Sequence, residues 1–494
     1  MNYFYHSTRS TDESVTSKKA IRKGIADDGG LYVSDSLGSQ QLDLGQVCSQ
    51  DYRSNARLVL GSLLSDFSDE EMNSCVERAY GSSFSHEAVC PVTPMGSDYL
   101  LELFHGPTSA FKDVALQMLP HLMATASADA GEKIMIVCAT SGDTGKAALA
   151  GFADAPGVGV SVFYPAGGVS DIQRLQMVSQ AGNNVAVCAI HGNFDDAQTE
   201  VKHIFSDHDL SERLSQRSQV LSSANSINVG RLAPQVVYYF DAYAQLVSQG
   251  ALTQGQAVDF CVPTGNFGDV LAGYYAKRMG LPVGKLIVAT NINNVLHDFI
   301  ETGRYDRRRP FHKTISPSMD ILVSSNLERL LYYLSEGDCE LIASLMGQLN
   351  DEGFYQIPPA LFSRLRGEFE SGTATDDMTR QAIHDVWESE QVLLDPHTAV
   401  ARCVLDARKS SENPRVCLAT ASPYKFSADV LQALGASTEG LDGLACMDKL
   451  HELTGVAVPR PLASLRDAHE RWLDEVDVSD MSSYVEQACE RLLS

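Results

Sequence analysis

The sequence predicts an α/β protein built on parallel sheets, and three observations support this. Apolar runs without polar alternation recur along the chain, as in KIMIVCAT at residues 133–140, which is typical of strands buried on both faces. Amphipathic segments follow these runs, as helices do in such folds. The composition, 44% hydrophobic and 20% charged, is that of a globular protein with a large core. We expect strands at residues 133–140, 159–165, 184–190, 256–263, 285–291 and 414–420.

The length of 494 residues suggests two or three domains, at about 150 residues each. Residues 1–95 are polar and helix-leaning, with a capping box in which Glu71 follows Ser68 by three positions. We therefore expect a mostly helical N-terminal domain. A smaller α/β domain is expected over residues 96–230 and a larger one over 231–494, with a mostly helical insertion around 335–395.

Charge and cysteine usage exclude several classes of function. The net charge of −25 repels nucleic acid and anionic membranes, and no apolar run approaches the roughly 20 residues of a spanning helix. The N-terminus lacks the pattern of a secretory signal. Eleven dispersed cysteines, with no CxxC pair and no metal-like spacing, favour a reducing compartment. We expect a cytoplasmic protein that binds no metal, nucleic acid or membrane.

The first distinctive loop, CATSGDTGKAAL at residues 138–149, runs from a buried strand into a helix. Its glycines, hydroxyls and helix N-terminus could cradle an anion. A nucleotide-binding P-loop is a weak alternative, because Thr140 and Ala147 stand where that motif needs glycine and Ser/Thr. A tight strand–helix connection with a hydroxyl cap is the purely structural alternative.

Two further loops end predicted strands. Residues 261–280, CVPTGNFGDVLAGYYAKRMG, contain a glycine-rich turn whose N–H groups could point at one phosphate. The turn is not GxGxxG, so the dinucleotide fingerprint is absent. In CLATASPYKFS, residues 417–427, a strand ends at Thr420. On local grounds alone, Thr420 is most simply a satisfied hydroxyl in a turn.

Lys112, in ELFHGPTSAFKDVALQ, occupies an unusual position at the start of an apolar-periodic segment. A fixed cation is mildly disfavoured near a helix N-terminus, and burial moves the pKa of an amine toward neutrality. These conditions suit a Schiff-base lysine, and with a phosphate cradle they suit pyridoxal phosphate. From this segment alone, an ordinary surface lysine beside Asp113 is an equal alternative.

The chain resembles the threonine synthase family, of the longer type common in bacteria and fungi. The resemblance rests on ELFHGPTSAFKDVALQ, ATSGDTGKAAL, SSANSINVGR, VPTGNFGDVLAG, ATNINNVL and ATASPYKF, which occur in family order over almost the full length. It implies the tryptophan-synthase-β type of pyridoxal phosphate fold. That fold has two α/β domains with the cofactor in the cleft between them, plus an N-terminal domain.

The resemblance also implies roles for individual residues. Lys112 would hold the cofactor and later move protons, and Thr420 would bond the pyridine nitrogen. The cofactor phosphate would lie on Gly265, Asn266, Phe267, Gly268 and Asp269. Three residues would face the substrate's amino-acid portion and the phenolic edge of the cofactor ring: Ser141, Asp143 and Thr144. Candidates for binding the substrate phosphate are Asn225, Ser226, Asn228, Arg231 and Lys425.

The implied reaction converts O-phospho-L-homoserine and water into L-threonine and phosphate. Two departures from the family are Pro263-Thr264, where some relatives have Ser-Gly, and Ser422, where some have histidine. They leave open a related phospholyase that releases 2-oxobutyrate, ammonia and phosphate. A non-catalytic anion-binding module is the remaining alternative. The longer members of the family lead us to expect a monomer.

Overall fold

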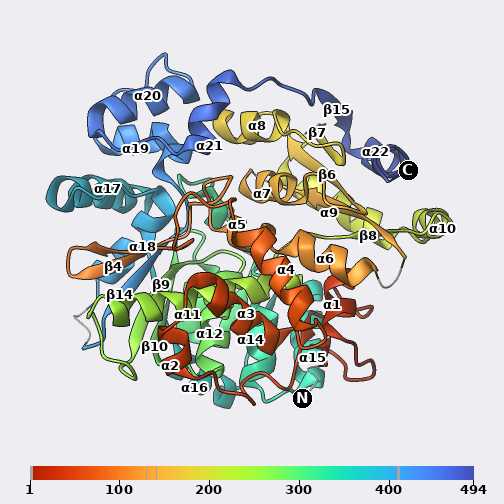
Figure 1. The fold of residues 1–494 in the computed structure, drawn as a ribbon, viewed down its shortest axis with the longest axis horizontal. Coiled ribbons are helices and arrows are strands. Elements are labelled where there is room, and N and C mark those ends of the chain that lie inside the picture. Colours follow the sequence, from red (N-terminus) through yellow and green to blue (C-terminus); the bar gives the residue numbers. More distant parts are fainter. Residues whose placement is uncertain (1–3, 129–130, 141, 409–411, 494) are drawn as a thin grey trace.

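The computed structural model describes residues 4–128, 131–140, 142–408 and 412–493 and has two main sheets (Figure 1). The first sheet has five parallel strands in the order β15-β7-β6-β5-β8. Its strands are β5 (Lys133–Ala139), β6 (Val158–Pro165), β7 (Val185–His191), β8 (Gln219–Ser222) and β15 (Asp474–Asp477). The expected strands at 133–140, 159–165 and 184–190 are confirmed.

Alternate residues of this sheet enter two different cores, which explains the unbroken apolar runs. Ile134 and Ile136 pack in the large central core, together with α6 (Leu119–Ala128) and α7 (Asp143–Phe152). Met135 and Val137 pack on the other face against α9 (Phe194–Ser206), α10 (His208–Ser215) and α22 (Met481–Leu492). Both faces are therefore covered, as expected for a parallel sheet.

The second sheet has six strands in the order β13-β10-β9-β14-β4-β3, and only the β3–β4 pair is antiparallel. Its strands are β3 (Val92–Met95), β4 (Asp98–Glu102), β9 (Val258–Pro263), β10 (Val283–Thr290), β13 (Phe369–Thr373) and β14 (Arg415–Ala419). The expected strands at 256–263, 285–291 and 414–420 are confirmed. One face packs on α11 (Val229–Ser248) and α12 (Gly268–Arg278), the other on α18 (Pro396–Asp406).

The N-terminal region is mostly helical, as expected. It comprises α1 (Ser17–Lys23), α2 (Leu44–Cys48), α3 (Tyr52–Leu63) and α4 (Asp69–Tyr80), with the short antiparallel pair β1 (His6–Ser7) and β2 (Tyr32–Val33). The capping box of Ser68 and Glu71 is present at the start of α4. Helix α3 packs on α11, so this region is fixed to the central core.

The segment around 335–395 combines helices with strands. It contains α15 (Cys339–Asp351), α16 (Pro359–Glu368) and α17 (Asp376–Glu390), but also β12 (Phe354–Gln356) and β13, the edge of the six-stranded sheet. β12 pairs with β11 (Arg304–Asp306) outside the segment. The remaining helices are α5 (Lys112–Leu116), α8 (Asp171–Val178), α13 (Val295–Thr302), α14 (Leu327–Leu334), α19 (Ser427–Ala433), α20 (Gly443–Thr454) and α21 (Arg460–Ala463).

Three strands cross the expected domain boundaries, and the first is β3, which lies in the expected N-terminal domain but pairs with β4 in the six-stranded sheet. Strand β4, inside the expected smaller domain, pairs with β14 in the six-stranded sheet, and the C-terminal β15 pairs with β7 in the five-stranded sheet. We propose a division that places residues 92–102 with the larger sheet and residues 474–492 with the smaller one. Within the described ranges, no helix has both the length and the apolar character needed to cross a membrane.

Candidate active site

A cleft of about 2090 Å³ lies where the carboxyl ends of both sheets meet. Residues that directly follow β5, β9 and β14 line it, namely Thr140, Thr264 and Thr420. Parallel sheets place ligands at the carboxyl ends of their strands. The three loops singled out in the sequence therefore meet in one cleft, together with Lys112.

Lys112 is buried at the first turn of α5, with 9% of its surface exposed. Its Nζ lies 4.6 Å from the ring centre of Phe111 and 3.8 Å from Oδ2 of Asp143. Burial lowers the pKa of Lys112 to about 8; the Asp143 carboxylate opposes this shift, and the charges of Arg231 and Lys425 add to it. The alternative of an ordinary surface lysine is therefore wrong.

The neighbours of Lys112 fix its place in the cleft. The N–H of Phe111 donates to the carbonyl of Thr420 at 2.8 Å, which joins the lysine to the end of β14. The carboxylate of Asp113 accepts hydrogen bonds from the N–H and Oγ1 of Thr108, at 2.8 and 2.7 Å. Asp113 thus closes the turn before the lysine.

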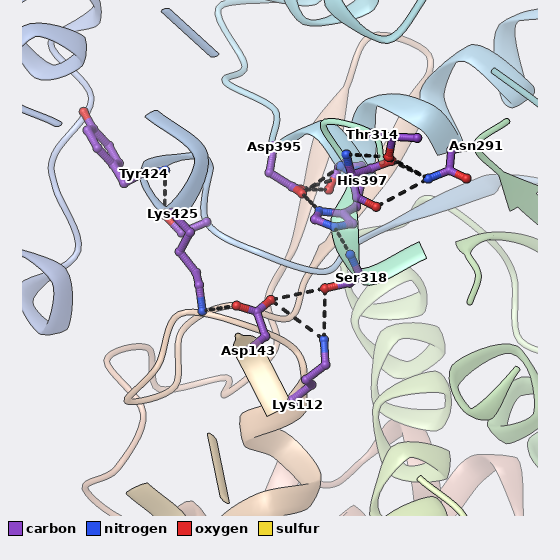
Figure 2. Close-up of polar contacts among 12 residues, drawn as sticks. Lys112, Asp143, Asn291, Thr314, Ser318, Asp395, His397, Tyr424 and Lys425 are labelled. Atoms are coloured by element: carbon purple, nitrogen blue, oxygen red, sulfur yellow. Dashed lines mark hydrogen bonds and ion pairs between the residues drawn. The ribbon is translucent and has the colours of Figure 1, made fainter. Parts of the chain in front are cut away.

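Asp143 lies between two lysines, Lys112 and Lys425, and contacts both (Figure 2). Its Oδ1 lies 2.7 Å from Nζ of Lys425 and accepts from Nε2 of Gln173 at 3.1 Å. Burial alone would raise the pKa of Asp143, but the charges of Lys425 and Lys112 outweigh it and hold the pKa below its usual range. Lys425 also donates to the carbonyl of Thr108 at 2.9 Å.

The loop after β5 is shaped by one hydroxyl. Oγ1 of Thr140 accepts from the N–H groups of Gly142 and Gly145, at 3.0 and 2.9 Å. Thr144 lines the cleft at the start of α7, whereas the expected site residue Ser141 lies outside the described residues. Lys146, which suggested a P-loop, contacts Gln180 and is not among the residues lining the cleft.

The loop after β9 offers unused backbone donors. Phe267 adopts a left-handed conformation (φ 63°), is buried, and packs against Phe369. Carbonyl groups of the loop accept hydrogen bonds from Ser324 and Asn326. No described residue accepts a hydrogen bond from the N–H groups of residues 265–269. These donors, at the N-terminus of α12, form the kind of site that binds phosphate.

Asp269 contributes only its backbone N–H to this set of donors, because its side chain is turned toward α11. Its Oδ1 accepts hydrogen bonds from the hydroxyls of Tyr238 and Tyr239, at 2.6 and 3.0 Å. Burial raises the pKa of Asp269 to about 6, and the two tyrosines oppose the shift. The carboxylate therefore anchors α12 to α11.

The expected substrate-phosphate residues separate into two groups. Asn225, Ser226 and Arg231 line the cleft. Asn228 does not, because it caps α11: its Nδ2 donates to the carbonyl of Ile21 at 2.8 Å and its Oδ1 accepts from the N–H of Gly230 at 2.8 Å. Lys425 is also outside the lining and is held by Asp143.

Two residues not singled out in the sequence belong to the site. Ser318 and His397 both line the cleft, and Ser318 contacts Lys112. No local motif marked either residue. The only sequence signal was weak: His397 follows Asp395-Pro396, a typical helix start.

These residues fit pyridoxal phosphate. The cleft combines a buried amine of lowered pKa with a set of backbone donors that have no partner among the described residues. A Cβ on Gly265 would lie 2.8 Å from the carbonyl oxygen of Ser318, so this part of the cradle requires glycine. Among the described residues, no group of three His, Cys, Asp or Glu side chains could hold a metal ion.

Comparisons with known proteins agree with this geometry. The family described as pyridoxal-phosphate dependent enzyme matches residues 99–421, and the threonine synthase N-terminal and C-terminal families match residues 4–80 and 398–484. Threonine synthase from Pseudomonas aeruginosa is 40% identical over 87% of this chain and 90% of its own. Human threonine synthase-like 1 is also 40% identical over 86% of this chain, which spans only 59% of the human protein.

Two solved structures are similar along nearly the whole chain. The structure of PLP-bound threonine synthase from Brucella melitensis has a TM-score of 0.88 and 38% identity, covering 98% of this chain and 99% of its own. The structure from yeast has a TM-score of 0.87 and 32% identity, covering 99% of this chain and 98% of its own. The chain therefore has the tryptophan-synthase-β type of fold and belongs to the threonine synthase family of pyridoxal-phosphate-dependent enzymes.

Proposed function

We propose that the protein is a threonine synthase, which converts O-phospho-L-homoserine and water into L-threonine and phosphate. One observation carries the proposal: a buried lysine with a pKa of about 8 shares a cleft with the backbone N–H groups of residues 265–269, which donate to no described residue. The family relationship supports it.

The cofactor would be held at three places. Lys112 would carry it covalently through Nζ, the N–H groups of residues 265–269 would bind its phosphate, and the hydroxyl of Thr420 would bond its ring nitrogen. Asp143 would face the phenolic edge of the ring. When bound, pyridoxal phosphate supplies an electron sink for negative charge at the substrate's Cα.

Arg231 is the best-supported contact for the substrate phosphate. It is buried, it lines the cleft, and its guanidinium has no carboxylate within ion-pair distance among the described side chains. It donates to the carbonyl of Ala224 at 2.6 Å, while its Nε has no partner in the described structure. Buried charges are ordinarily paired, so an anionic ligand would complete this site, with Asn225 and Ser226 beside it.

Lys112 would move the protons of the reaction. A base is most effective when its pKa lies near the working pH, and a pKa near 8 meets this condition. The lysine would take the proton from Cα, and it would have to give that proton up before it could take one from Cβ. Arg231 would fix the substrate's phosphate and stabilise the charge that develops as it leaves. Ser141 and Thr144 would hold the amino-acid portion. Closure of the smaller domain would exclude water until the addition at Cβ.

The direct test is to supply O-phosphohomoserine and assay threonine, 2-oxobutyrate and phosphate together. We expect threonine and phosphate in equal amounts. Predominant 2-oxobutyrate would instead support the phospholyase, and release of neither product would overturn the proposal. Any variant of Lys112 in this assay is compared with Lys146→Met. Burial also lowers the pKa of Lys146 to about 8, but Lys146 is outside the cleft lining, so this variant should keep the activity.

We also propose that the enzyme is cytoplasmic and monomeric and that it binds neither nucleic acid nor membranes. All eleven cysteines are free thiols, and most are buried, which supports a reducing compartment. The monomer rests on the resemblance to longer family members. Size-exclusion chromatography with light scattering tests it, and a mass near 53.6 kDa is expected.

A further inference from the structure

Ser318 reaches the reactive amine from a loop with no recognisable motif. Figure 2 shows its hydroxyl between Lys112 and Asp143. Nζ of Lys112 donates to Oγ of Ser318 at 3.4 Å, and that hydroxyl donates to Oδ2 of Asp143 at 3.4 Å. The direct distance from Nζ to Oδ2 is 3.8 Å, which is too long for a hydrogen bond. The hydroxyl therefore bridges the two charges.

One end of the loop is held by Asp320. Its Oδ1 accepts hydrogen bonds from Oγ1 of Thr314 and from Nδ2 of Asn291 and Asn293, at 2.7, 2.8 and 2.9 Å. Its Oδ2 accepts from the N–H of Thr314 at 3.0 Å. Asn291 directly follows β10, Asn293 lies two residues further along, and both are buried. Asp320 thus ties the loop to the end of a central strand.

A second brace comes from the start of α18. Nε2 of His397 accepts the N–H of Ser318 at 3.1 Å, and Nδ1 of His397 lies 2.7 Å from Oδ1 of Asp395 (Figure 2). Because Nε2 is the acceptor, the ring proton belongs on Nδ1, where it donates to Asp395. The carboxylate of Asp395 is itself buried and caps α18. The imidazole therefore has a fixed orientation.

The backbone and the side chain of Ser318 make different contacts. Its backbone N–H donates to His397, and among the described residues its hydroxyl contacts only Lys112 and Asp143. A residue that served only the loop's shape would not need this hydroxyl. The contacts of His397 and Asp320 therefore fix the loop so that Oγ of Ser318 lies beside the amine of Lys112.

We propose that Ser318 is a positioning residue for Lys112, and that His397 and Asp320 fix the loop that carries it. The inference rests on the proposed role of Lys112 as the cofactor lysine. A lysine has a long, flexible side chain, and whenever its amine is free of the cofactor it must stay where it can take a proton. The Ser318 hydroxyl holds it there by accepting from the amine and donating to Asp143.

The test is the reactivity of Lys112 in cofactor-free protein. The fraction of Lys112 acetylated by acetic anhydride is measured by mass spectrometry across pH for wild type, Ser318→Ala and Ser318→Thr. The midpoint is the pH at which acetylation of Lys112 reaches half of its maximum. Ser318→Ala removes the Oγ that accepts from the Lys112 amine, which disfavours the ammonium form, so the midpoint should fall by roughly half to one pH unit. Ser318→Thr keeps a hydroxyl and should restore most of the shift.

The matched control is Ser161→Ala, which removes a buried hydroxyl that has no partner in the described structure and is outside the cleft lining. It should leave the midpoint unchanged. His397→Phe removes the acceptor of the Ser318 N–H and should shift the midpoint in the same direction as Ser318→Ala, by less. With substrate, Ser318→Ala should lower kcat by about tenfold with KM nearly unchanged.

An unshifted midpoint in Ser318→Ala would overturn the role of Ser318, and an unshifted midpoint in His397→Phe would overturn that of the brace. Both outcomes are distinct from failure of the proposed function. The latter would appear in wild type as a cofactor that never becomes linked to Lys112.

Discussion

Asp143 and Asp269 occupy similar places, each in the first turn of a helix that follows a strand of one of the two main sheets. Their surroundings nevertheless shift the pKa values of the two carboxyl groups in opposite directions. Both carboxylates are buried, at 4% and 6% exposure. The pKa of Asp143 is held below its usual range by Lys425 and Lys112, whereas that of Asp269, whose nearest partners are tyrosine hydroxyls, rises to about 6. Burial is common to both and the charge of Lys112 acts on both, so the ion pair with Lys425, which only Asp143 of the two makes in the described structure, decides the direction.

The difference extends to what each loop presents to the cleft. The loop after β5 contributes a charged side chain that reaches lysines from two other segments. The loop after β9 directs Phe267 toward Phe369 and Asp269 toward α11, and no described residue accepts a hydrogen bond from the N–H groups of residues 265–269. One loop acts through side-chain charge, the other through backbone donors.

The largest effect is expected from removing the amine that Asp143 faces. Lys112→Ala should reduce turnover by at least about 10³-fold, because it removes both the covalent attachment and the base. Folding should be retained, as judged by circular dichroism, and Lys146→Met should keep activity near wild type. Wild-type turnover in Lys112→Ala would show that another group carries the chemistry.

Removing the carboxylate of Asp143 should destabilise the fold. Asp143→Ala leaves Lys425, whose side chain is fully buried, without a carboxylate, and such a loss costs about 3–5 kcal/mol. Urea unfolding at pH 7 measures it, and adding Lys425→Met should recover much of the loss. Because the folded pKa of Asp143 is depressed, its contribution is fully present above about pH 4 and is lost only at lower pH. A loss below about 1 kcal/mol would contradict the pairing.

Asp269 should show the opposite dependence on pH. Its folded pKa of about 6 exceeds the ordinary value of 3.8, so the folded state binds the proton more tightly. Stability due to this group is fully present below about pH 4, and about 3 kcal/mol of it is lost in total as pH rises through 6 and beyond. Asp269→Asn should remove that dependence. Urea unfolding of both proteins at several pH values tests this, and a constant difference between them would contradict it.

A smaller effect is expected from filling the backbone cradle. Gly265→Ala would place a Cβ 2.8 Å from the Ser318 carbonyl oxygen, so the loop must shift. We expect pyridoxal phosphate to bind about tenfold more weakly, equivalent to ~1.4 kcal/mol, as measured by fluorescence titration of the apoprotein. Gly347→Ala, where a Cβ meets nothing within 4 Å, is the control. Equal affinity in both variants would argue against close approach at this glycine.

The framework of the fold was predictable because strands buried on both faces leave unbroken apolar runs. The short strands β4, β8 and β13 were not identified, since four or five residues such as FESGT in β13 carry little periodicity. The crossing of β15 into the smaller sheet could not be predicted, because pairing with β7 is a tertiary contact.

The site was predictable to the extent that its residues lie in local motifs. Lys112 and the two glycine-rich loops were found from strand ends and turns. Asn228 could have been recognised as a helix cap, since it directly precedes the long apolar α11. The pairing of Lys425 with Asp143, and the approach of Ser318 to Lys112, join segments more than 200 residues apart. No local pattern encodes such contacts.

The central claim is that Lys112 is the residue that carries the cofactor. Purified protein loaded with pyridoxal phosphate is reduced with borohydride, digested, and mapped by mass spectrometry. We predict a pyridoxyl group on the peptide containing Lys112 and none on peptides containing Lys146 or Lys425. A label on either of those lysines, or no stable label at all, would contradict the account.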